Sequence, residues 1–528
     1  MSFEILDKSL CGRIGLLKTR HGNIKTPTLL PVLNPVKQEL SAQDIAKIGF
    51  DAVITNAYLL WRNMKGKPRD VHDHLNFNGP IMTDSGAYQI LRYGAVEVKP
   101  EEIVEYEKLI NSDIAVILDV PTGPDDDWNK AKESVEITLH RAIESNKIRD
   151  HERLWVGPIQ GGKYLDLVRL SAKSMYQQGF DIYAVGSPTG LMEGYKFSTV
   201  LKMVITAKSI IGSGNPLHLF GAGHPMFFPF MVAVGVDLFD SAAYALYAQD
   251  GRYITSSGTF RINDLKELPC NCPVCSKASA DDVRNMSQEE RKRFLMIHNL
   301  YVSLSEVKRV RQHITEGTLW ELCEERSRAH PSLFNAMKVL VKFHKYLERC
   351  DPITKPVIHG LFFYSNETAL RPQTYRHVMR IISNYSPEFV KLIILLPPVI
   401  NRPYIRSSVI RNIIQLINNT KYANSSCIAI VGDPFIFIPI ELSEIYPLSQ
   451  YEGMACSKAL SKIFIDNFPN LKFLDGLEVA ISISDKHNND LLNKINEYLR
   501  EKGVKVIEIS LKKGDSMIKI LKNVLSLL

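Results

Sequence analysis

The stretch "GPIMTDSGAYQI" places a carboxylate, Asp84, at the end of a short apolar run and directly before Ser85 and Gly86. Asp, Ser and Gly are ordinary turn residues, so Asp84 taken alone is explained by capping the next turn. The alternative is that this carboxylate is placed for chemistry, as a general acid, a general base or a nucleophile. The rest of the chain has to decide between the two interpretations.

A second chemically distinctive group is the cysteine cluster in "LPCNCPVCSKAS", which contains Cys270, Cys272 and Cys275. Three thiolates so close together need a fourth ligand to complete a tetrahedral zinc site. His298, in the helical stretch "RFLMIHNLYVS", is the best candidate for that ligand. Because three thiolates and one imidazole leave no open position, we predict one structural Zn²⁺ per chain. Three unliganded cysteines in a loop are the alternative.

The elements that must position these residues alternate between short apolar runs and amphipathic stretches. This alternation predicts parallel strands separated by helices. Eight such units within about 250 residues fit a (β/α)8 barrel. A doubly wound open sheet is the alternative, although no Gly-x-Gly-x-x-Gly turn follows the first strand. The eight runs are "TPTLLPV", "DAVITNAY", "GPIMTDSG", "DIAVILDVPTG", "RLWVGPIQGG", "DIYAVGSPTG", "PLHLFGAGHP" and "DLFDSAAYALYA".

Polar residues cluster where these strands end. In a barrel the carboxyl ends of the strands meet at one mouth, and barrel enzymes keep their active sites there. One aspartate at a strand end is a cap, but several polar residues around one rim form a pocket. The rim candidates are Asp84, Asp119, Gln160, Gly186, His224 and Asp240.

Other titratable residues near these motifs receive plainer interpretations. Asp237 lies three positions before Asp240, so in an alternating strand the two side chains face opposite ways. His224 in "GAGHP" is interpreted as a structural loop histidine, and His72 and His74 as surface loop residues.

Composition narrows the class of protein. The chain has 528 residues, 45% hydrophobic and 23% charged, which is typical of a soluble globular protein with two or three domains. No signal peptide begins it, and its longest apolar stretch, "LIILLPPVI", is far short of the roughly 20 residues that cross a bilayer. We therefore expect a cytoplasmic protein with no membrane partner. The net charge of +7 is compatible with an RNA partner but does not require one.

After about residue 345 the rhythm changes. Strand-like runs such as "KLIILLPPVI", "CIAIVGDPFIFIPI" and "EVAISISD" are followed by the helical "NNDLLNKINEYLREKG", the strand "VKVIEISL" and a last helix. We predict a barrel domain over 1–345, with a zinc-binding insertion at 270–298, and a smaller C-terminal α/β domain over 346–528.

The order TDSG, LD-x-PT, IQGG, AVG, FGAGHP, DLFDSA and then Cys-x-Cys-x2-Cys plus histidine resembles that of the tRNA-guanine transglycosylases. These are zinc-bearing barrel enzymes that exchange a guanine base in tRNA for a 7-deazaguanine. "TNAYLL", "AVGSPTGLMEGY", "DLFDSAAYALYAQDGRYIT" and "FFYSNETALRP" are similar to the archaeal, archaeosine-forming branch. In that branch the incoming base is preQ0 (7-cyano-7-deazaguanine), and it replaces guanine 15 in the D-arm.

The resemblance implies a double displacement through a covalent tRNA intermediate. By motif position Asp240 matches the nucleophile and Asp84 the general acid/base, although either aspartate could be assigned the attack from sequence. Asp119 matches the residue that accepts hydrogen bonds from the purine edge. The remaining implied base contacts are Gln160 and the Gly186 backbone on the carbonyl side of the base, Ser85, and Tyr88 as a stacking partner or as plain packing.

The chain departs from the archaeal pattern in one respect. Archaeal members usually end in a PUA domain that grips tRNA, and we see no such β-barrel pattern after "KVIEISLKKGDSMIKILKNVLSLL". Either a separate PUA-type protein supplies it or the enzyme works without it. Family members dimerise, so a homodimer is expected. The rival hypotheses are a non-catalytic tRNA-binding subunit of a two-chain enzyme, and a queuine-type exchanger acting on the anticodon.

Overall fold

The protein is described by a computed structural model that covers residues 2–87, 98–357, 359–398, 401–432, 434–453, 455–485, 489–511 and 516–528. The chain forms two compact units. The first comprises Met1–Leu340 with Cys350–Val357, and the second comprises Val341–Arg349 with Ile358–Leu528.

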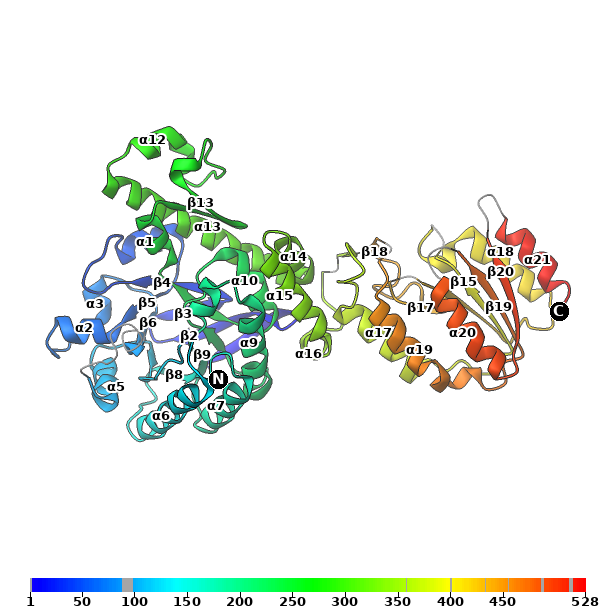
Figure 1. Ribbon diagram of the computed structural model, residues 1–528, viewed down its shortest axis with the longest axis horizontal. Helices are drawn as coiled ribbons and strands as arrows, with labels where there is room; N and C mark the ends of the chain where they lie inside the picture. The colour runs from blue at the N-terminus through cyan, green and yellow to red at the C-terminus, as the bar shows by residue number, and fades with distance from the viewer. Residues whose placement is uncertain are drawn as a thin grey trace. The chain divides into compact units, whose positions relative to one another are not determined.

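The first unit is a closed barrel of eight parallel strands (Figure 1). The strands pair in chain order, and the last strand closes the ring by pairing with the first, with Asp240 opposite Leu30. The predicted (β/α)8 barrel is therefore confirmed, with all eight runs in their expected places. The barrel strands are β4 (Thr28–Leu33), β5 (Val53–Asn56), β6 (Ile81–Asp84), β7 (Ile114–Val116), β8 (Leu154–Ile159), β9 (Ile182–Val185), β10 (Leu217–Leu219) and β11 (Leu238–Ser241).

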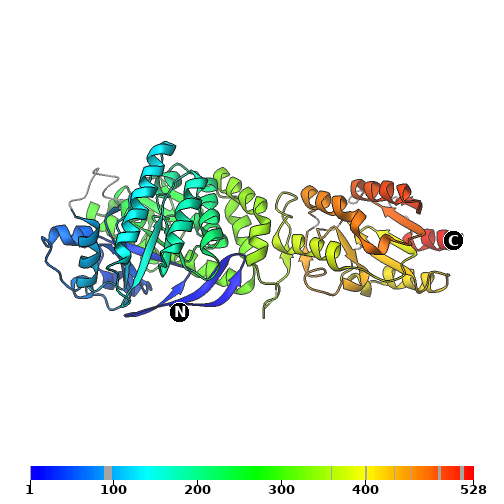
Figure 2. The same cartoon turned by 90° about the horizontal axis from the view of Figure 1, so that it is seen from below.

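A short antiparallel sheet precedes the barrel, and the sequence analysis did not predict it. Its strands are β1 (Phe3–Ser9), β2 (Gly12–Thr19) and β3 (Gly22–Thr26), coloured blue in Figure 2. Phe3, Leu17 and Ile24 belong to the same apolar cluster as the inward-facing barrel residues Leu30 and Ile54. This sheet therefore covers the amino-terminal end of the barrel and leaves the carboxyl-terminal end for the site.

Helices between the strands cover the outside of the barrel (Figure 1). Several begin at residues with the expected capping chemistry: Ser41 accepts from Asp44 N–H at 3.1 Å in a capping box at the start of the first helix. The helices are α1 (Ala42–Ile48), α2 (Ala57–Asn63), α3 (Val71–Leu75), α5 (Pro100–Leu109), α6 (Trp128–Asn146), α7 (Leu165–Gln177), α8 (Thr189–Glu193), α9 (Phe197–Ile211), α10 (Phe228–Ala233) and α11 (Ala243–Gln249).

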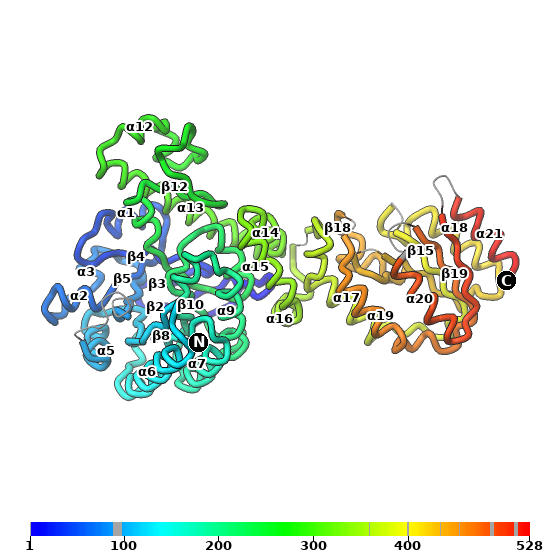
Figure 3. Tube along the Cα trace, in the orientation of Figure 1, coloured from blue at the N-terminus to red at the C-terminus, as the bar shows by residue number. Residues whose placement is uncertain are grey.

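The cysteine-bearing segment stands at one edge of the barrel, in the green part of the trace (Figure 3). A hairpin leads into it, and a helix of 29 residues, from Gln288 to Glu316, leads back to the barrel. That helix begins with a Ser287–Glu290 capping box and ends at Gly317, whose positive φ of 76° is typical of a helix C-terminus. The elements are β12 (Arg252–Thr255), β13 (Gly258–Arg261), α12 (Ala280–Asn285), α13 (Gln288–Glu316), α14 (Leu319–Ser327) and α15 (Pro331–Lys342).

The second unit is built around a five-stranded sheet in the order β17-β16-β15-β19-β20. Its strands are parallel except β17, which runs antiparallel to β16. Two separate buried apolar clusters contain alternate residues of β15, as expected for a sheet with helices on both faces. The elements are α16 (His344–Cys350), β14 (Leu361–Phe362), α17 (Pro372–Asn384), β15 (Leu392–Leu396), α18 (Ser408–Asn418), β16 (Ser426–Val431), β17 (Phe437–Pro439), β18 (Tyr451–Glu452), α19 (Lys458–Asn467), β19 (Val479–Ser484), α20 (Asn489–Glu501), β20 (Lys505–Ser510) and α21 (Met517–Leu525).

The helices of the described part of the chain differ from those that cross membranes. None of its helices combines the length and the apolar character that crossing a membrane requires.

Candidate active site

The polar side chains at the barrel mouth follow the same inward and outward alternation as the apolar core residues of the same strands. Met82 of β6 and Leu238 of β11 belong to the inward-facing cluster. Because side chains alternate along a strand, the residues two positions further on, Asp84 and Asp240, also face inward. The same spacing relates Ile54 and Ala184 of the cluster to Asn56 and Gly186, and Gln160 lies four positions after Val156, in the same phase of its strand.

Asp84 is enclosed and lies among other carboxylates. Burial, together with the nearby carboxylates of Asp119 and Asp240, raises the pKa of Asp84 to about 7. The Asn56 side-chain amide donates to Asp84 Oδ2 at 2.8 Å, and this contact acts in the opposite direction. An aspartate in this environment carries a proton on a large fraction of molecules at neutral pH, so it can act as an acid as well as a base.

Asp240 has a different set of neighbours. His218 of β10 contacts Asp240 Oδ1 through Nε2 at 2.8 Å, and the backbone N–H of Gly221 donates to the same oxygen at 2.9 Å. Among the described residues no hydrogen bond or ion pair is found for Asp240 Oδ2. The carboxyl group is therefore fixed through one oxygen while the other is available to a ligand.

Asp119 and Gln160 form a hydrogen-bonded pair beside these two carboxylates. Gln160 Nε2 donates to Asp119 Oδ2, and Gln160 Oε1 accepts from Thr122 N–H at 3.2 Å and from Ser187 Oγ at 2.9 Å. Burial raises the pKa of Asp119 to about 6, and the hydrogen bond from Gln160 opposes that effect. Asp119 is therefore mostly ionised at neutral pH, in an environment where its oxygens need donors.

The other predicted base-contact residues lie at the same mouth but use their polar groups differently. Ser85 is fully buried, and its hydroxyl donates to the Ile117 carbonyl at 3.1 Å. The Gly186 N–H donates to the Ile159 carbonyl at 2.9 Å, so it is already engaged, contrary to the expectation that this backbone reads a base. What Gly186 provides is space, because a Cβ there would overlap the side chain of Gln160. Tyr88 lies outside the described residues.

Asp237 and His224 have the structural contacts that the sequence analysis expected. Asp237 is fully buried and forms an ion pair with Arg13, whose Nε donates to Asp237 Oδ1 at 2.9 Å. It therefore faces away from the Asp240 carboxyl group. His224 accepts from Met226 N–H at 3.2 Å through Nδ1, and burial lowers its pKa to about 4, so it is a neutral loop histidine.

The four predicted metal ligands come together. One donor atom from each of Cys270, Cys272, Cys275 and His298 lies within 4.8 Å of the others. His298 Nδ1 is 3.7 Å from Cys272 Sγ and 3.3 Å from Cys275 Sγ. Bonds of roughly 2.0–2.3 Å in a tetrahedron place donor atoms roughly 3.3–3.8 Å apart, so the cluster fits a bound metal ion.

Two further contacts orient the imidazole of this metal centre. His298 Nε2 donates to the Ile254 carbonyl at 2.9 Å, which leaves Nδ1 as the ligand atom. The Tyr253 ring stacks on His298 with centroids 3.6 Å apart, and its hydroxyl is 3.5 Å from Cys275 Sγ. The hairpin that carries these residues therefore supports the site.

The interpretation of His72 and His74 as surface loop residues is wrong. Both lie in α3, and His72 Nε2 is 3.1 Å from the buried carboxylate of Asp113, which also binds His21 Nδ1 at 2.9 Å. The three residues bring potential metal ligands within 4.8 Å of one another. The centroids of the two imidazoles lie 3.8 Å apart with the rings tilted by 37°, and each imidazole contacts an oxygen of Asp113, so we interpret the group as a hydrogen-bonded clamp.

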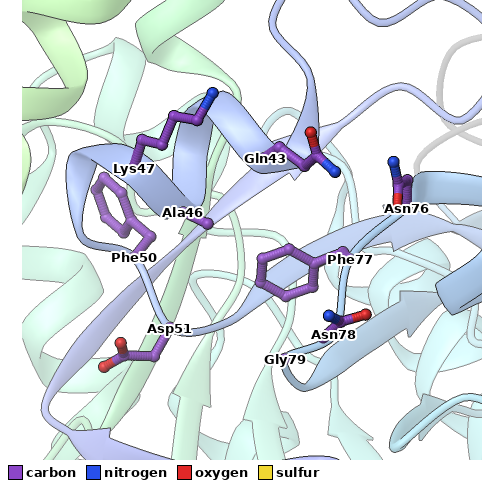
Figure 4. A pocket seen from close by; sticks show the side chains of 9 residues that line it. All are labelled: Gln43, Ala46, Lys47, Phe50, Asp51, Asn76, Phe77, Asn78 and Gly79. Carbon is purple, nitrogen blue, oxygen red and sulfur yellow. The ribbon is translucent and has the colours of Figure 1, made fainter.

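A shallow hollow with a volume of about 390 Å³ lies elsewhere on the first unit. Figure 4 shows the rings of Phe50 and Phe77 lining it, between α1 and the segment that leads into β6. Asp51 and Gly79, which also line it, precede β5 and β6, so the hollow is at the amino-terminal ends of these strands. It contains none of the predicted site residues.

Two residues of the site were missed by sequence reasoning, namely Asn56 and His218. Each occupies the inward-facing phase of its strand and contacts one of the two aspartates. Marking the alternate, inward-facing positions of the strands "VITN" and "LHL" would have identified both residues. Their partners could not have been identified, because each contact joins two different strands.

Comparisons with known proteins agree with this arrangement. A family model described as queuine tRNA-ribosyltransferase matches residues 7–332, and one described as a domain of unknown function (DUF5591) matches residues 374–459. Three proteins named tRNA-guanine(15) transglycosylase are similar over most of the chain. They come from Sulfolobus acidocaldarius (46% identical; 71% of this chain, 76% of that protein), Pyrobaculum aerophilum (44%; 87% and 92%) and Methanocaldococcus jannaschii (40%; 89% and 71%).

Proposed function

The chain belongs to the queuine tRNA-ribosyltransferase family, and on this premise we propose that it is a tRNA-guanine transglycosylase, a pentosyltransferase that installs preQ0 at guanine 15. This exchange is a step in archaeosine biosynthesis. The observation that carries the proposal is the placement of Asp84, Asp240 and the Asp119–Gln160 pair at one barrel mouth. Guanine 15 is favoured over an anticodon position by the names of the similar proteins.

The two aspartates receive distinct roles. Asp240 is the nucleophile, because one of its oxygens is held by two N–H donors while the other is available. Asp84 is the general acid/base, because burial and neighbouring carboxylates raise its pKa to about 7, close to working pH. This division is our proposal for the alternative that sequence left open.

The exchange then proceeds in two displacements. Asp240 forms a bond to C1′ of the ribose as the bond from C1′ to guanine breaks, and the electron pair of that bond leaves with the base. Asp84 gives its proton to the departing guanine and later takes a proton from the incoming preQ0. The second base displaces Asp240 from C1′, so configuration is retained and no net proton is consumed.

Base recognition is assigned to Asp119 and Gln160. A carboxylate matches the N1–H and amino donors that guanine and preQ0 share, and a base lacking them would leave Asp119 buried without those partners. Ser85 closes the same wall of the pocket through its bond to Ile117, and Tyr88 stays a predicted stacking partner. For Gly186 we propose that the absent side chain, rather than its N–H group, serves the site.

The cysteine–histidine cluster is proposed to hold one structural Zn²⁺ per chain. When bound, the ion supplies a cross-link between the 270–275 loop and α13 and no reactive position, since four protein ligands complete its coordination. Cys270, Cys272 and Cys275 come from the loop and His298 from the helix.

The partners follow from this activity. The substrates are tRNA, guanine and preQ0. We also propose that residues 1–345 form the catalytic domain and that residues 346–528 form an α/β extension. A homodimer and a separate PUA-type protein remain predictions, to be tested by the mass of the purified chain in solution and by stimulation with a PUA-type protein.

The experiment that tests the function is incorporation of radiolabelled guanine into unmodified tRNA by the full chain. We expect incorporation in the wild type, competition by preQ0, and loss in Asp84→Asn and Asp240→Asn. Asp73→Asn, at an exposed position of α3, is the matched control and should behave as wild type. A tRNA carrying adenine at position 15 should accept no label.

Other outcomes identify the rival functions. Label that survives the position-15 change but disappears when the anticodon guanine is replaced would indicate a queuine-type exchanger. No label with an intact metal site, but tight tRNA binding, would indicate a non-catalytic subunit.

A further inference from the structure

His218 is a buried histidine to which the proposed chemistry gives no role beyond its contact with Asp240. It lies on β10 with no exposed surface, in the inward-facing phase next to β11. Its Nε2 is 2.8 Å from Asp240 Oδ1, and its ring lies 4.7 Å from that of Phe220. Because a carboxylate oxygen can only accept, Nε2 carries the proton of this contact.

The other ring nitrogen is unusual. His218 Nδ1 is buried and has no hydrogen-bond partner among the described residues. A buried polar atom left unpaired costs roughly 1–3 kcal/mol. An apolar side chain could fill the same space without burying an unpaired nitrogen, so packing alone does not explain an imidazole here. What an apolar side chain could not supply is the contact made by Nε2.

The geometry around Asp240 shows what this contact does. His218 and the Gly221 N–H approach the same oxygen, Oδ1, from β10 and from the loop that follows it. Two donors on one oxygen fix the plane of the carboxyl group, which a single donor would leave free to turn. The orientation of the second oxygen, Oδ2, is then fixed relative to Asp84 at the same barrel mouth.

We propose that His218 is the positioning residue for the nucleophile and that Asp240 Oδ2 is the atom that bonds to C1′. The inference rests on the proposed function. In the first displacement the Oδ2 lone pair forms the bond to C1′, the electron pair of the C1′–base bond leaves with guanine, and Asp84 supplies the proton. His218 keeps its own proton throughout and exchanges none with the substrate.

Two substitutions test this role. His218→Leu removes the donor, whereas His218→Gln places an amide N–H close to the position of Nε2. The quantities to measure are kcat and KM for guanine exchange, the yield of covalent tRNA adduct on a denaturing gel, and the Tm of each variant. A nucleophile released from its orientation loses about a hundredfold in rate. We therefore expect His218→Leu to lose about that factor in kcat, with adduct formation slowed and the KM for tRNA unchanged.

The glutamine variant and the control make the test selective. His218→Gln should recover kcat to within about tenfold of the wild type, because the donor is restored. His140→Gln, at an exposed position of α6, should behave as the wild type. Wild-type kcat in His218→Leu overturns the proposal, and so does an equal loss in both His218 variants accompanied by a fall in Tm. Failure of the wild-type chain to exchange guanine would instead refute the proposed function.

Discussion

Replacing Asn56 by serine should move the alkaline limb of the exchange reaction to higher pH. In the proposed mechanism exchange requires a proton on Asp84 for the departing base, and the pKa of Asp84 is raised to about 7 by burial and by the carboxylates of Asp119 and Asp240. Activity should therefore fall above about pH 7 as Asp84 ionises. The Asn56 amide donates to Asp84 Oδ2 at 2.8 Å and favours the ionised form. Without that donor the proton is held to higher pH.

The size of the change follows from one hydrogen bond. A hydrogen bond to a charged group contributes roughly 1.5–3 kcal/mol, and about 1.36 kcal/mol corresponds to one pH unit. Water and the serine hydroxyl replace part of the contact, so we expect the limb to move by about one pH unit. At pH 9 the variant should then retain about tenfold more of its maximal kcat/KM than the wild type.

Serine is chosen because it preserves the second contact of Asn56. The Asn56 side-chain oxygen accepts from Leu59 N–H at 2.8 Å and caps α2, and serine is an equally good capping residue. The assay is kcat/KM for unmodified tRNA, followed by incorporation of labelled guanine at saturating concentration from pH 5 to 9.5, with Asn285→Ser at an exposed helix end as the matched control.

The acid limb provides an internal reference. We expect it to report Asp119, whose pKa is raised to about 6 by burial and whose ionised form binds the base in the proposed mechanism. The groups that shift the pKa of Asp119 are Gln160, Arg141 and its own backbone, besides burial, so the acid limb should stay in place while the alkaline limb moves. An alkaline limb that does not move, or that moves to lower pH, would show that Asp84 is not the proton donor.

Three further predictions concern packing, metal and stability. Gly186→Ala should displace Gln160 and raise the KM for guanine by about tenfold or more, whereas Gly214→Ala, whose Cβ would meet nothing within 4 Å, should leave the KM unchanged. Cys272→Ser should release the metal ion and lower Tm by several degrees, measured by metal analysis and thermal unfolding. Asp237→Asn should destabilise the chain by about 3–5 kcal/mol in denaturant unfolding, because it leaves a buried guanidinium unpaired, while loss of the Asp240 charge should not.

Strand order and the metal cluster could be predicted because both depend on residues near one another in sequence. Polar residues directly after an apolar run mark the end of a strand wherever it lies, and the spacing of Cys270, Cys272 and Cys275 is a local feature. The closed barrel and the four-residue cluster follow from such patterns. The antiparallel sheet before the barrel was not predicted because its strands are joined by short turns with no helix between them, so they lie outside the strand-helix alternation.

Residues whose role depends on a neighbouring strand could not be predicted. His72 was assigned to a surface loop because its partner, Asp113, is 41 positions away, beyond any local pattern. The N–H of Gly186 was expected to be available, but the register between β8 and β9 engages it with Ile159. Sequence gives the residue type at each position, whereas the register of adjacent strands decides which polar atoms remain for a ligand.

The same dependence explains how two aspartates at one mouth acquire different chemistry. Asp84 and Asp240 each follow an inward-facing core residue by two positions, so the alternation of the strands places them equivalently. Their difference comes from the groups that surround each carboxylate. β5 offers Asp84 one amide and leaves it near two carboxylates, whereas β10 and its loop hold one oxygen of Asp240 with two donors. The surroundings of each aspartate, rather than its position along the strand, therefore distinguish the two proposed roles.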